Sequence, residues 1–226
     1  MPHMPEGGDV QFTIRPLRRG DRAAVREICI ATAWMDEPAP QRIGDGWIWA
    51  EFWTRYFTDR EMGSSWVVES RPAGRVVGYL TGTADARRVG RYVPFLLPGI
   101  VARVVGRRLM RRAESRRALL AMLRSALRGE LDLPPAVARD YPATFHMDLL
   151  PEARRRGLGR QLLDRFLSRM RQLGVPGVHA QPLSVNEPIL RLTEAEGFRL
   201  VGRRSLSAFA HVDPRPIEVC TYVMRL

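Results

Sequence analysis

The sequence contains no lysine, so all 36 basic residues are arginine, and they outnumber the 24 acidic residues to give a formal net charge of +12. A bias toward arginine codons accounts for the missing lysine without any functional reason. The excess positive charge attracts polyanions, a group that includes nucleic acid, anionic membrane surfaces and phosphate-bearing ligands. Charge alone does not choose among these partners.

Cysteine is scarce as well. Cys29 and Cys220 lie far apart in the chain and have no metal-like spacing, so the sequence predicts neither a disulfide scaffold nor a metal site. The low cysteine content is typical of proteins of the reducing cytoplasm, and we expect a cytoplasmic location.

Long uninterrupted hydrophobic segments are also missing. Residues 1–9, MPHMPEGGD, lack the apolar core of a signal peptide, and we expect a flexible N-terminal tail there. The most apolar run, YVPFLLPGIVARVVG at 92–106, is broken by Pro94, Pro98 and Arg103. We therefore expect it to be too short and too interrupted to span a bilayer, and we expect no membrane partner.

The sequence does contain enough apolar residues for a sizeable core. Of its 226 residues 45% are hydrophobic, which predicts one large domain over 10–226. Alternating, β-rich patterns predict strands, and 3.6-residue periodicity predicts helices between them. Strands are expected at 10–17, 65–70, 74–85, 143–150, 177–183, 199–207 and 218–226, and helices at 20–34, 47–57, 158–173 and 186–197. Because the two kinds of element intermingle, the expected class is mixed α/β.

An arginine-rich insertion is expected at about 85–140. The piece between Gly99 and Gly129 holds nine arginines and no aromatic residue, and its apolar residues recur at helical spacing. We expect two helices or one broken helix that ends near Gly129, then a proline-rich return to the next strand. The insertion is interpreted as a solvated helical face, a lid, or a surface for an acidic partner.

The stretch LLPEARRRGLGRQLL, at 149–163, joins a predicted strand to a strongly amphipathic helix. The first N–H groups of a helix have no intrahelical acceptor, and the helix dipole adds positive potential there. Gly157 and Gly159 leave room for an anion to reach the backbone. Four arginines surround these glycines: Arg154, Arg155, Arg156 and Arg160. The turn therefore predicts a pyrophosphate site, although the P-loop and the dinucleotide-binding glycine patterns are both absent.

The order of residues in this turn, R-x-x-G-x-G over 154–159, resembles the GNAT superfamily of acyl-CoA-dependent N-acetyltransferases. Downstream, NEPILRLTEAEGF has Asn186, Gly197 and Phe198 at the spacing found in that family. The resemblance implies about seven strands in a central mixed sheet flanked by helices, acetyl-CoA as co-substrate and an amine acceptor. The cofactor-binding residues that it implies are Leu149, Leu150, Arg154, Arg155, Arg156, Gly157, Leu158, Gly159, Arg160 and Asn186.

A narrower resemblance rests on YPATFHMDLLP, at 141–151, and on the insertion just before it. These features are similar to small bacterial members of the superfamily and to the acetyltransferase-like domain of eukaryotic O-GlcNAc hydrolase. They imply a bacterial protein of that subgroup.

The chemistry that the resemblance implies is direct attack of an amine on the thioester. The amine needs a base to take its proton, and the oxyanion needs a backbone N–H, which falls at Leu149 or Leu150. Asp148 is the first candidate base, and His146 shares its face of the predicted strand. The alternatives are that Asp148 pairs with an arginine and that His146 is a hydrogen-bonded structural residue.

One position departs from the family. The tyrosine that protonates the leaving thiolate in many members is replaced by Thr193, whose hydroxyl is too weak an acid and too short. Tyr222 or an ordered water could take its place. This departure keeps open a catalytically weak or inactive CoA-binding protein.

A basic nucleic-acid-binding module is the other alternative, although the absence of aromatic residues among the arginines argues against recognition of single strands. We therefore do not expect nucleic acid as the partner, whereas a homodimer remains open.

If the chain handles acyl thioesters, the absence of lysine also protects it from self-acylation.

Overall fold

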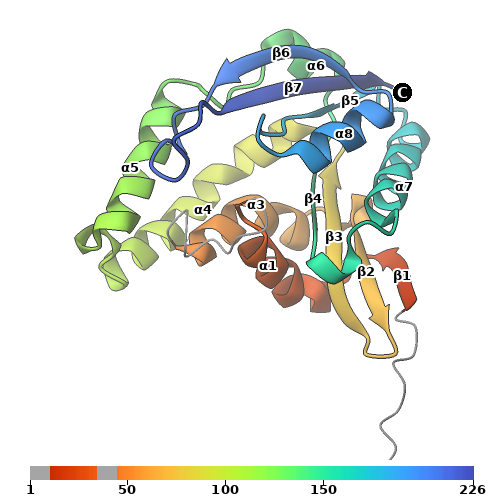
Figure 1. The fold of residues 1–226 in the computed structure, drawn as a ribbon, viewed down its shortest axis with the longest axis horizontal. Helices are drawn as coiled ribbons and strands as arrows, with labels where there is room; N and C mark the ends of the chain where they lie inside the picture. The colour runs from red at the N-terminus through yellow and green to blue at the C-terminus, as the bar shows by residue number, and fades with distance from the viewer. Residues whose placement is uncertain (1–10, 35–44) are drawn as a thin grey trace, which may run out of the picture.

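The computed structural model describes residues 11–34 and 45–226, so the expected tail at 1–9 lies outside the described residues. The described strands form two sheets (Figure 1). The first is antiparallel, in the order β1 (Gln11–Pro16), β2 (Trp66–Arg71), β3 (Arg75–Thr83) and β4 (Thr144–Leu149). The second is also antiparallel, in the order β5 (Gly177–Ala180), β7 (Glu218–Arg225) and β6 (Arg199–Ser205).

The two sheets meet at one point. A parallel bridge joins Ala143, just before β4, to Val178 in β5, and the His179 N–H donates to the Ala143 carbonyl at 2.9 Å. β5 then ends at Ala180, and the chain after it stays beside β7 through a bridge from Leu183 to Val219. The mixed α/β class and the seven strands are confirmed. The single central sheet is instead two sheets, because the short β5 leaves β4 after one bridge.

Helices cover both faces of the first sheet. α1 (Arg22–Ala31) and α3 (Gly46–Asp59) bury their apolar faces with Val67 and Tyr79. α7 (Leu158–Gln172) packs on the opposite face, against Val68 and Leu80. Neighbouring residues of one strand thus face different helices, as the alternation of a β-strand requires. Figure 1 shows α7 and the α1–α3 pair on either side of the strands.

α7 follows its predicted apolar stripe closely. Its buried residues are Leu158, Leu162, Leu163, Phe166, Leu167 and Met170. The apolar pattern over 158–173 also predicts Leu173 in this stripe, but Leu173 is 46% exposed at the end of the helix. Phe166 lies so close to β3 that a Cβ on Gly82 would come within 2.3 Å of its ring, so the helix requires a glycine there.

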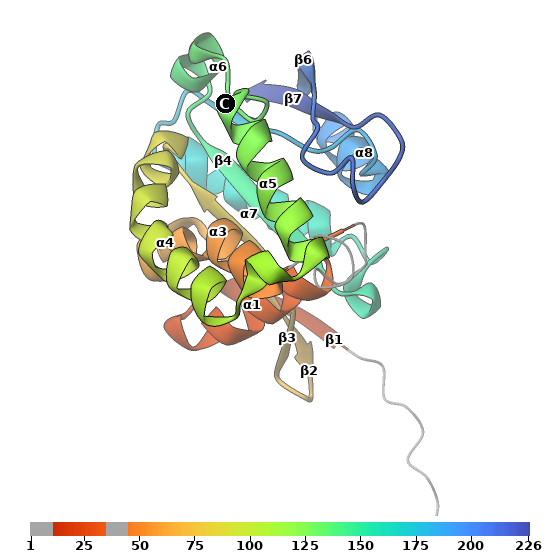
Figure 2. The same cartoon turned by 90° about the vertical axis from the view of Figure 1, so that its left-hand side faces the viewer.

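The insertion forms α4 (Ala86–Gly106), a short turn at Leu109–Arg111, α5 (Ala113–Leu127) and the six-residue α6 (Pro135–Asp140). In Figure 2, α4 and α5 lie on the side that faces the viewer. Two helices ending near Gly129 are confirmed, and α6 is an addition within the proline-rich return. α8 (Glu187–Ala195) packs beside the second sheet.

The expectation that prolines interrupt the most apolar run is wrong. α4 continues through Pro94 and Pro98 for 21 residues. Both prolines are exposed, so water can satisfy the carbonyls that lose their helical partners. By length and composition α4 is also apolar enough to cross a membrane, and only 6% of its most apolar stretch is buried.

The junction between the sheets contains a buried histidine. His179 is 3% exposed, and its Nδ1–H donates to the Tyr141 carbonyl at 2.6 Å. Burial lowers the pKa of His179, so the folded protein holds the ring neutral. A lowered folded-state pKa gives stability that is present above the unfolded value, about 6.5, and is lost as the pH falls below it.

We therefore expect the unfolding temperature to fall between pH 7 and pH 5 by more in the wild type than in His179→Asn. The amide can donate the same hydrogen bond and has no proton to gain. Thermal unfolding at several pH values measures the difference. Equal pH dependence in the two proteins would show that His179 does not contribute.

Candidate active site

The edge of β4 that faces the second sheet is open. The Leu150 N–H donates to the Val77 carbonyl at 2.8 Å, toward β3. In an antiparallel pair every second residue bonds to the same neighbour, and the register pairs Asp148 with Tyr79. The backbone groups of Phe145, Met147 and Leu149 therefore point the other way, into the gap that opens beyond the Ala143 bridge. Of the two proposed oxyanion donors, Leu150 is already bonded, and Leu149 faces the gap.

The turn after β4 presents a concave set of backbone donors. Arg155 has φ +55° and Gly157 has φ +72°, so two residues in this short turn adopt the left-handed conformation. The first helical residues, 158–160, have N–H groups without an intrahelical acceptor. Successive N–H groups in such a turn form a nest that binds anions, and the α7 dipole adds to it. The geometry is that of a phosphate site.

The arginines of the turn have different contacts. Arg154 donates from Nε to the Leu149 carbonyl at 2.7 Å and so ties the turn to the end of β4. Arg156 donates to the Glu152 carbonyl at 3.1 Å. Arg160 forms an ion pair with Glu196, 2.9 Å away. The Arg155 side chain is exposed beside the donors, where it can add charge to a bound phosphate.

The two glycines of the motif are not equivalent. At Gly157 a side chain would meet little but would have to adopt the left-handed conformation. At Gly159 the backbone is ordinary, and a Cβ would lie 3.6 Å from Leu192 and 3.7 Å from Leu149 and Met147. These are normal contact distances, so Gly157 is the position where any side chain is strained.

His146 and Asp148 lie on the opposite face of β4, as the alternation predicts, and both contact Tyr79. The Tyr79 hydroxyl is 2.5 Å from Asp148 Oδ2 and 3.1 Å from His146 Nδ1. Tyr79 is fully buried, and burial raises its pKa well above the usual value. It therefore stays protonated and donates to the carboxylate.

The two candidate bases keep reactive atoms available. Asp148 and His146 expose 18% and 26% of their side chains. Within the described residues, Asp148 Oδ1 and His146 Nε2 have no hydrogen-bond partner. The alternative pairing of Asp148 with an arginine is not seen there; its partner is Tyr79. No sequence pattern predicted a role for Tyr79, which stands out only as a phenol in the apolar run VVGYL.

A line of aromatic rings, here the aromatic wall, runs from His146 to the connection between β6 and β7. His146 stacks on Trp53 with 5.2 Å between the ring centroids and 14° between the planes. Trp49 lies 5.5 Å from Trp53 and 6.0 Å from Phe209, which contacts Trp34 at 4.9 Å. The helical spacing of the aromatic residues at 47–57 predicts either core packing or the lining of an acceptor pocket. Both occur, because Trp53 reaches the candidate site whereas Tyr56 and Phe57 are buried elsewhere.

The side chains across the gap differ from the family pattern. Thr193 is fully buried, and its hydroxyl donates within α8, 2.9 Å from both the Ile189 and Leu190 carbonyls. The Tyr222 hydroxyl donates to Glu194 at 2.6 Å, and this bond, with burial, raises the pKa of Tyr222 to about 12.

Asn186 stands at the N-terminal cap of α8, but its side chain makes no capping hydrogen bond. Its position in the sequence predicts either a helix cap or a contact to the pantetheine arm of CoA; since the cap is not formed, its amide is available to a ligand.

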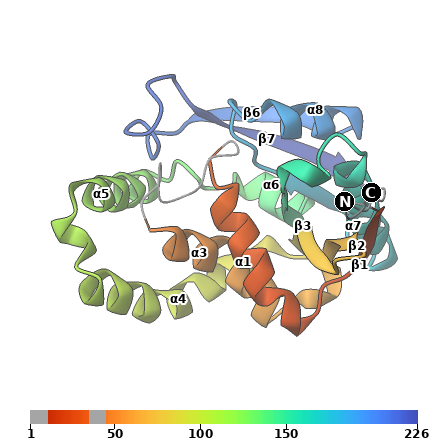
Figure 3. The same cartoon turned by 60° about the horizontal axis from the view of Figure 1, so that its bottom comes forward.

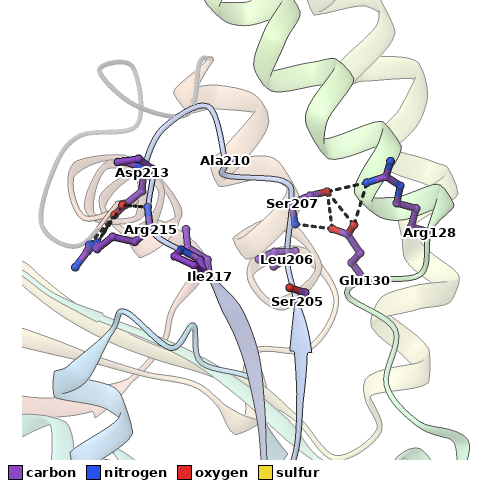
Figure 4. Close-up of a pocket in the computed structure, with 11 residues that line it drawn as sticks. Arg128, Glu130, Ser205, Leu206, Ser207, Ala210, Asp213, Arg215 and Ile217 are labelled. Carbon is purple, nitrogen blue, oxygen red and sulfur yellow. Dashed lines mark hydrogen bonds and ion pairs between the residues drawn. The ribbon is translucent and has the colours of Figure 1, made fainter.

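A separate pocket of about 410 Å³ lies at the β6–β7 connection (Figure 4). Its polar side chains pair with one another, Glu130 with Ser207 and Asp213 with Arg215. Leu206 also lines it and packs with the aromatic wall. The pocket therefore lies behind the wall, away from the turn at the start of α7.

Comparisons with known proteins agree with this geometry. Residues 29–198 match the Acetyltransferase (GNAT) family. The crystal structure of SsHAT is 29% identical, with a TM-score of 0.70, and the match covers 95% of this chain and 98% of that one.

Two more distant structures share the fold. The Drosophila melanogaster polyamine N-acetyltransferase is 18% identical, with a TM-score of 0.62 and coverage of 96% and 100%. A Sinorhizobium meliloti phosphinothricin acetyltransferase in complex with acetyl-CoA is 19% identical, with a TM-score of 0.55 and coverage of 95% and 88%. Since the family match spans most of the chain, this protein belongs to the GNAT family of acetyltransferases.

Proposed function

We propose that this protein is an N-acetyltransferase that moves the acetyl group of acetyl-CoA to a primary amine of a small molecule or peptide. The observation that carries the proposal is the arrangement around β4. One edge of the strand is open and leads into an anion-binding turn, and the other face holds two candidate bases beside Tyr79. A related acetyltransferase with acetyl-CoA bound supports the choice of co-substrate.

In this proposal the turn holds the pyrophosphate of CoA. The N–H groups of 157–160 and the Arg155 side chain neutralise its charge. The pantetheine arm adds to the open edge of β4, where Phe145 and Met147 offer backbone groups, and it takes a further hydrogen bond from Asn186. The thioester carbonyl then lies at the Leu149 N–H.

The amine approaches from the side of the aromatic wall. Asp148 Oδ1 or His146 Nε2 takes the proton from the ammonium form, which frees the nitrogen lone pair. The amine attacks the thioester carbonyl, and the Leu149 N–H stabilises the oxyanion that forms. Collapse of this intermediate breaks the carbon–sulfur bond and releases the CoA thiolate, and the nitrogen loses its second proton to water to leave a neutral amide. Tyr79 contacts neither substrate and keeps both bases in position.

Tyr222 is the proposed proton donor to the thiolate, in place of the family tyrosine. Its hydroxyl is protonated at any physiological pH, and the raised pKa of about 12 makes it a weaker acid than an ordinary tyrosine. We expect Tyr222→Phe to lower kcat by about a hundredfold, the low end of general-acid effects, because a thiolate leaves without full protonation. Steady-state kinetics measures this loss. A kcat within twofold of wild type would assign the proton to water instead.

The function itself is tested by following thiol release from acetyl-CoA with a panel of primary amines and peptides. Release that depends on the amine, together with an acetylated product by mass spectrometry, supports the proposal. Binding of acetyl-CoA without turnover of any amine would favour a CoA-binding protein that is not a catalyst. Salt-sensitive affinity for nucleic acid without CoA binding would favour the nucleic-acid module.

We also retain the narrower relationship as a proposal, that the chain is a cytoplasmic, bacterial relative of the acetyltransferase-like domain of O-GlcNAc hydrolase. Its support is the helical insertion that precedes β4.

A further inference from the structure

The arginine hairpin, which we define as residues 86–128, carries nearly all the excess charge of the protein. It comprises α4, the turn after it and α5, and it contains twelve arginines and one carboxylate, Glu114. Its net charge of +11 compares with +12 for the whole chain. The remainder of the molecule is therefore close to neutral.

The same hairpin also exposes most of the large apolar side chains that reach the surface. Of the ten recorded for the described residues, seven lie on it: Phe95, Leu97, Val101, Val105, Met110, Leu123 and Leu127. Three are more than two-thirds exposed, namely Phe95 at 73%, Val105 at 69% and Leu127 at 79%. An apolar surface of this kind on a soluble fold marks an interaction site.

Charge and apolarity are ordered along α4. At spacings of three and four residues its exposed side begins with Arg87 and Arg91 and continues through apolar residues to Val105. Exposed arginines at 107, 108, 111 and 112 follow in the turn that ends the helix. Residues at these spacings share one side of a helix. The exposed side is therefore an apolar strip with arginines at both ends.

The opposite side of α4 is held by the protein. Leu96 is 3% exposed, and Arg103 forms an ion pair with Asp45, 2.9 Å away. Tyr92 packs on Tyr56 of α3 with 5.5 Å between the rings. Figure 3 shows α4 and α5 as a hairpin that extends away from the strands. Because one side is packed, α4 is placed to lie along a surface and not to cross it.

We infer that the arginine hairpin docks on an anionic lipid bilayer. The apolar strip enters the boundary between headgroups and acyl chains, and the arginines bind the lipid phosphates. A second copy of the chain would place +11 against +11, and nucleic acid would leave the apolar strip in water. An anionic lipid surface matches both features. This replaces the expectation that the protein has no membrane partner.

Flotation with lipid vesicles tests the inference. We expect the full-length protein to float with vesicles of phosphatidylcholine and phosphatidylglycerol, to remain unbound with phosphatidylcholine alone, and to be released by added salt. Binding that is the same for both vesicle types, or absent for both, would overturn the inference.

Two combined variants identify the surface. Phe95→Ser with Val101→Ser and Val105→Ser should weaken partitioning at least about tenfold, because three apolar side chains no longer leave water. Arg107→Gln with Arg108→Gln and Arg111→Gln should weaken it roughly fivefold for each arginine removed. Acetyl-CoA binding is measured on every variant to show that the fold is intact, since none of these residues belongs to the proposed CoA site.

Matched controls carry the same changes elsewhere. The apolar control combines Leu173→Ser, Leu200→Ser and Val201→Ser, and the charge control combines Arg165→Gln, Arg171→Gln and Arg199→Gln; all six positions are exposed. We expect both controls to bind vesicles like the wild type. If the controls lose as much binding as the hairpin variants, or if the variant without the three apolar side chains binds vesicles as tightly as the wild type, the lipid surface is not the partner.

Discussion

Replacing Gly157 with valine is expected to weaken acetyl-CoA binding by at least about a hundredfold. Gly157 has φ +72°, a conformation in which a β-branched residue is strained by about 1–3 kcal/mol. Relief of that strain rotates the backbone and moves the N–H groups at the start of α7. Hydrogen bonds to a charged group contribute about 1.5–3 kcal/mol each, so loss of two of them accounts for the effect.

Titration calorimetry with acetyl-CoA, at about physiological salt so that bulk charge is partly screened, measures this change. The chain offers a matched control at the other end of the same helix. Gly174 has φ +66° and has no neighbour within 4 Å of an added Cβ. Gly174→Val therefore carries a similar strain far from the turn. Equal loss of binding in both variants would attribute the effect to instability of α7.

Asp148→Asn is expected to lower kcat by about 10²–10⁴-fold while acetyl-CoA binding stays unchanged. The amide has nearly the same shape as the carboxylate but cannot accept a proton from the amine. It still accepts the hydrogen bond of Tyr79, 2.5 Å away in the wild type, so β4 should keep its form. Steady-state kinetics with a reactive amine measures the loss, and calorimetry verifies the cofactor site.

Two comparisons sharpen this result. Asp164→Asn changes an exposed carboxylate on α7 and should leave kcat unchanged. Tyr79→Phe removes the hydroxyl shared by both candidate bases and, as a positioning change, should shift the pH profile of kcat. If Asp148→Asn retains full activity while His146→Gln does not, His146 is the base and Asp148 holds it through Tyr79.

The helices and strands that were predicted well are those with one buried face, because the spacing of their apolar residues follows the period of the element. The stripe of α7 and the alternation of β4 depend only on which side meets the core. The division into two sheets depends on where β5 leaves β4, which no local pattern encodes. The continuity of α4 through Pro94 and Pro98 was not predicted. Whether a proline ends a helix depends on whether water can reach the freed carbonyl, and the sequence does not show which side of the helix is exposed.

The candidate site shows the same division. The anion-binding turn could be predicted because its glycines and the helix start are adjacent in the sequence. Tyr79 could not, since it comes from β3 and reaches Asp148 and His146 only through strand pairing. The difference between Gly157 and Gly159 also could not be predicted, because the motif does not specify the backbone angle φ at either glycine.

In the proposed reaction, the open edge of β4 offers its backbone to the cofactor, whereas the opposite face offers side chains to the acceptor. A change of residue type at 146 or 148 alters what the second substrate meets but leaves the main chain that faces the first one in place. Selection can therefore explore new amines by substitutions at Trp53 and Trp49, beside the candidate bases, without losing the acetyl donor. In such a fold, binding of the acetyl donor is separated from binding of the acceptor, so the acceptor can change while the donor stays the same.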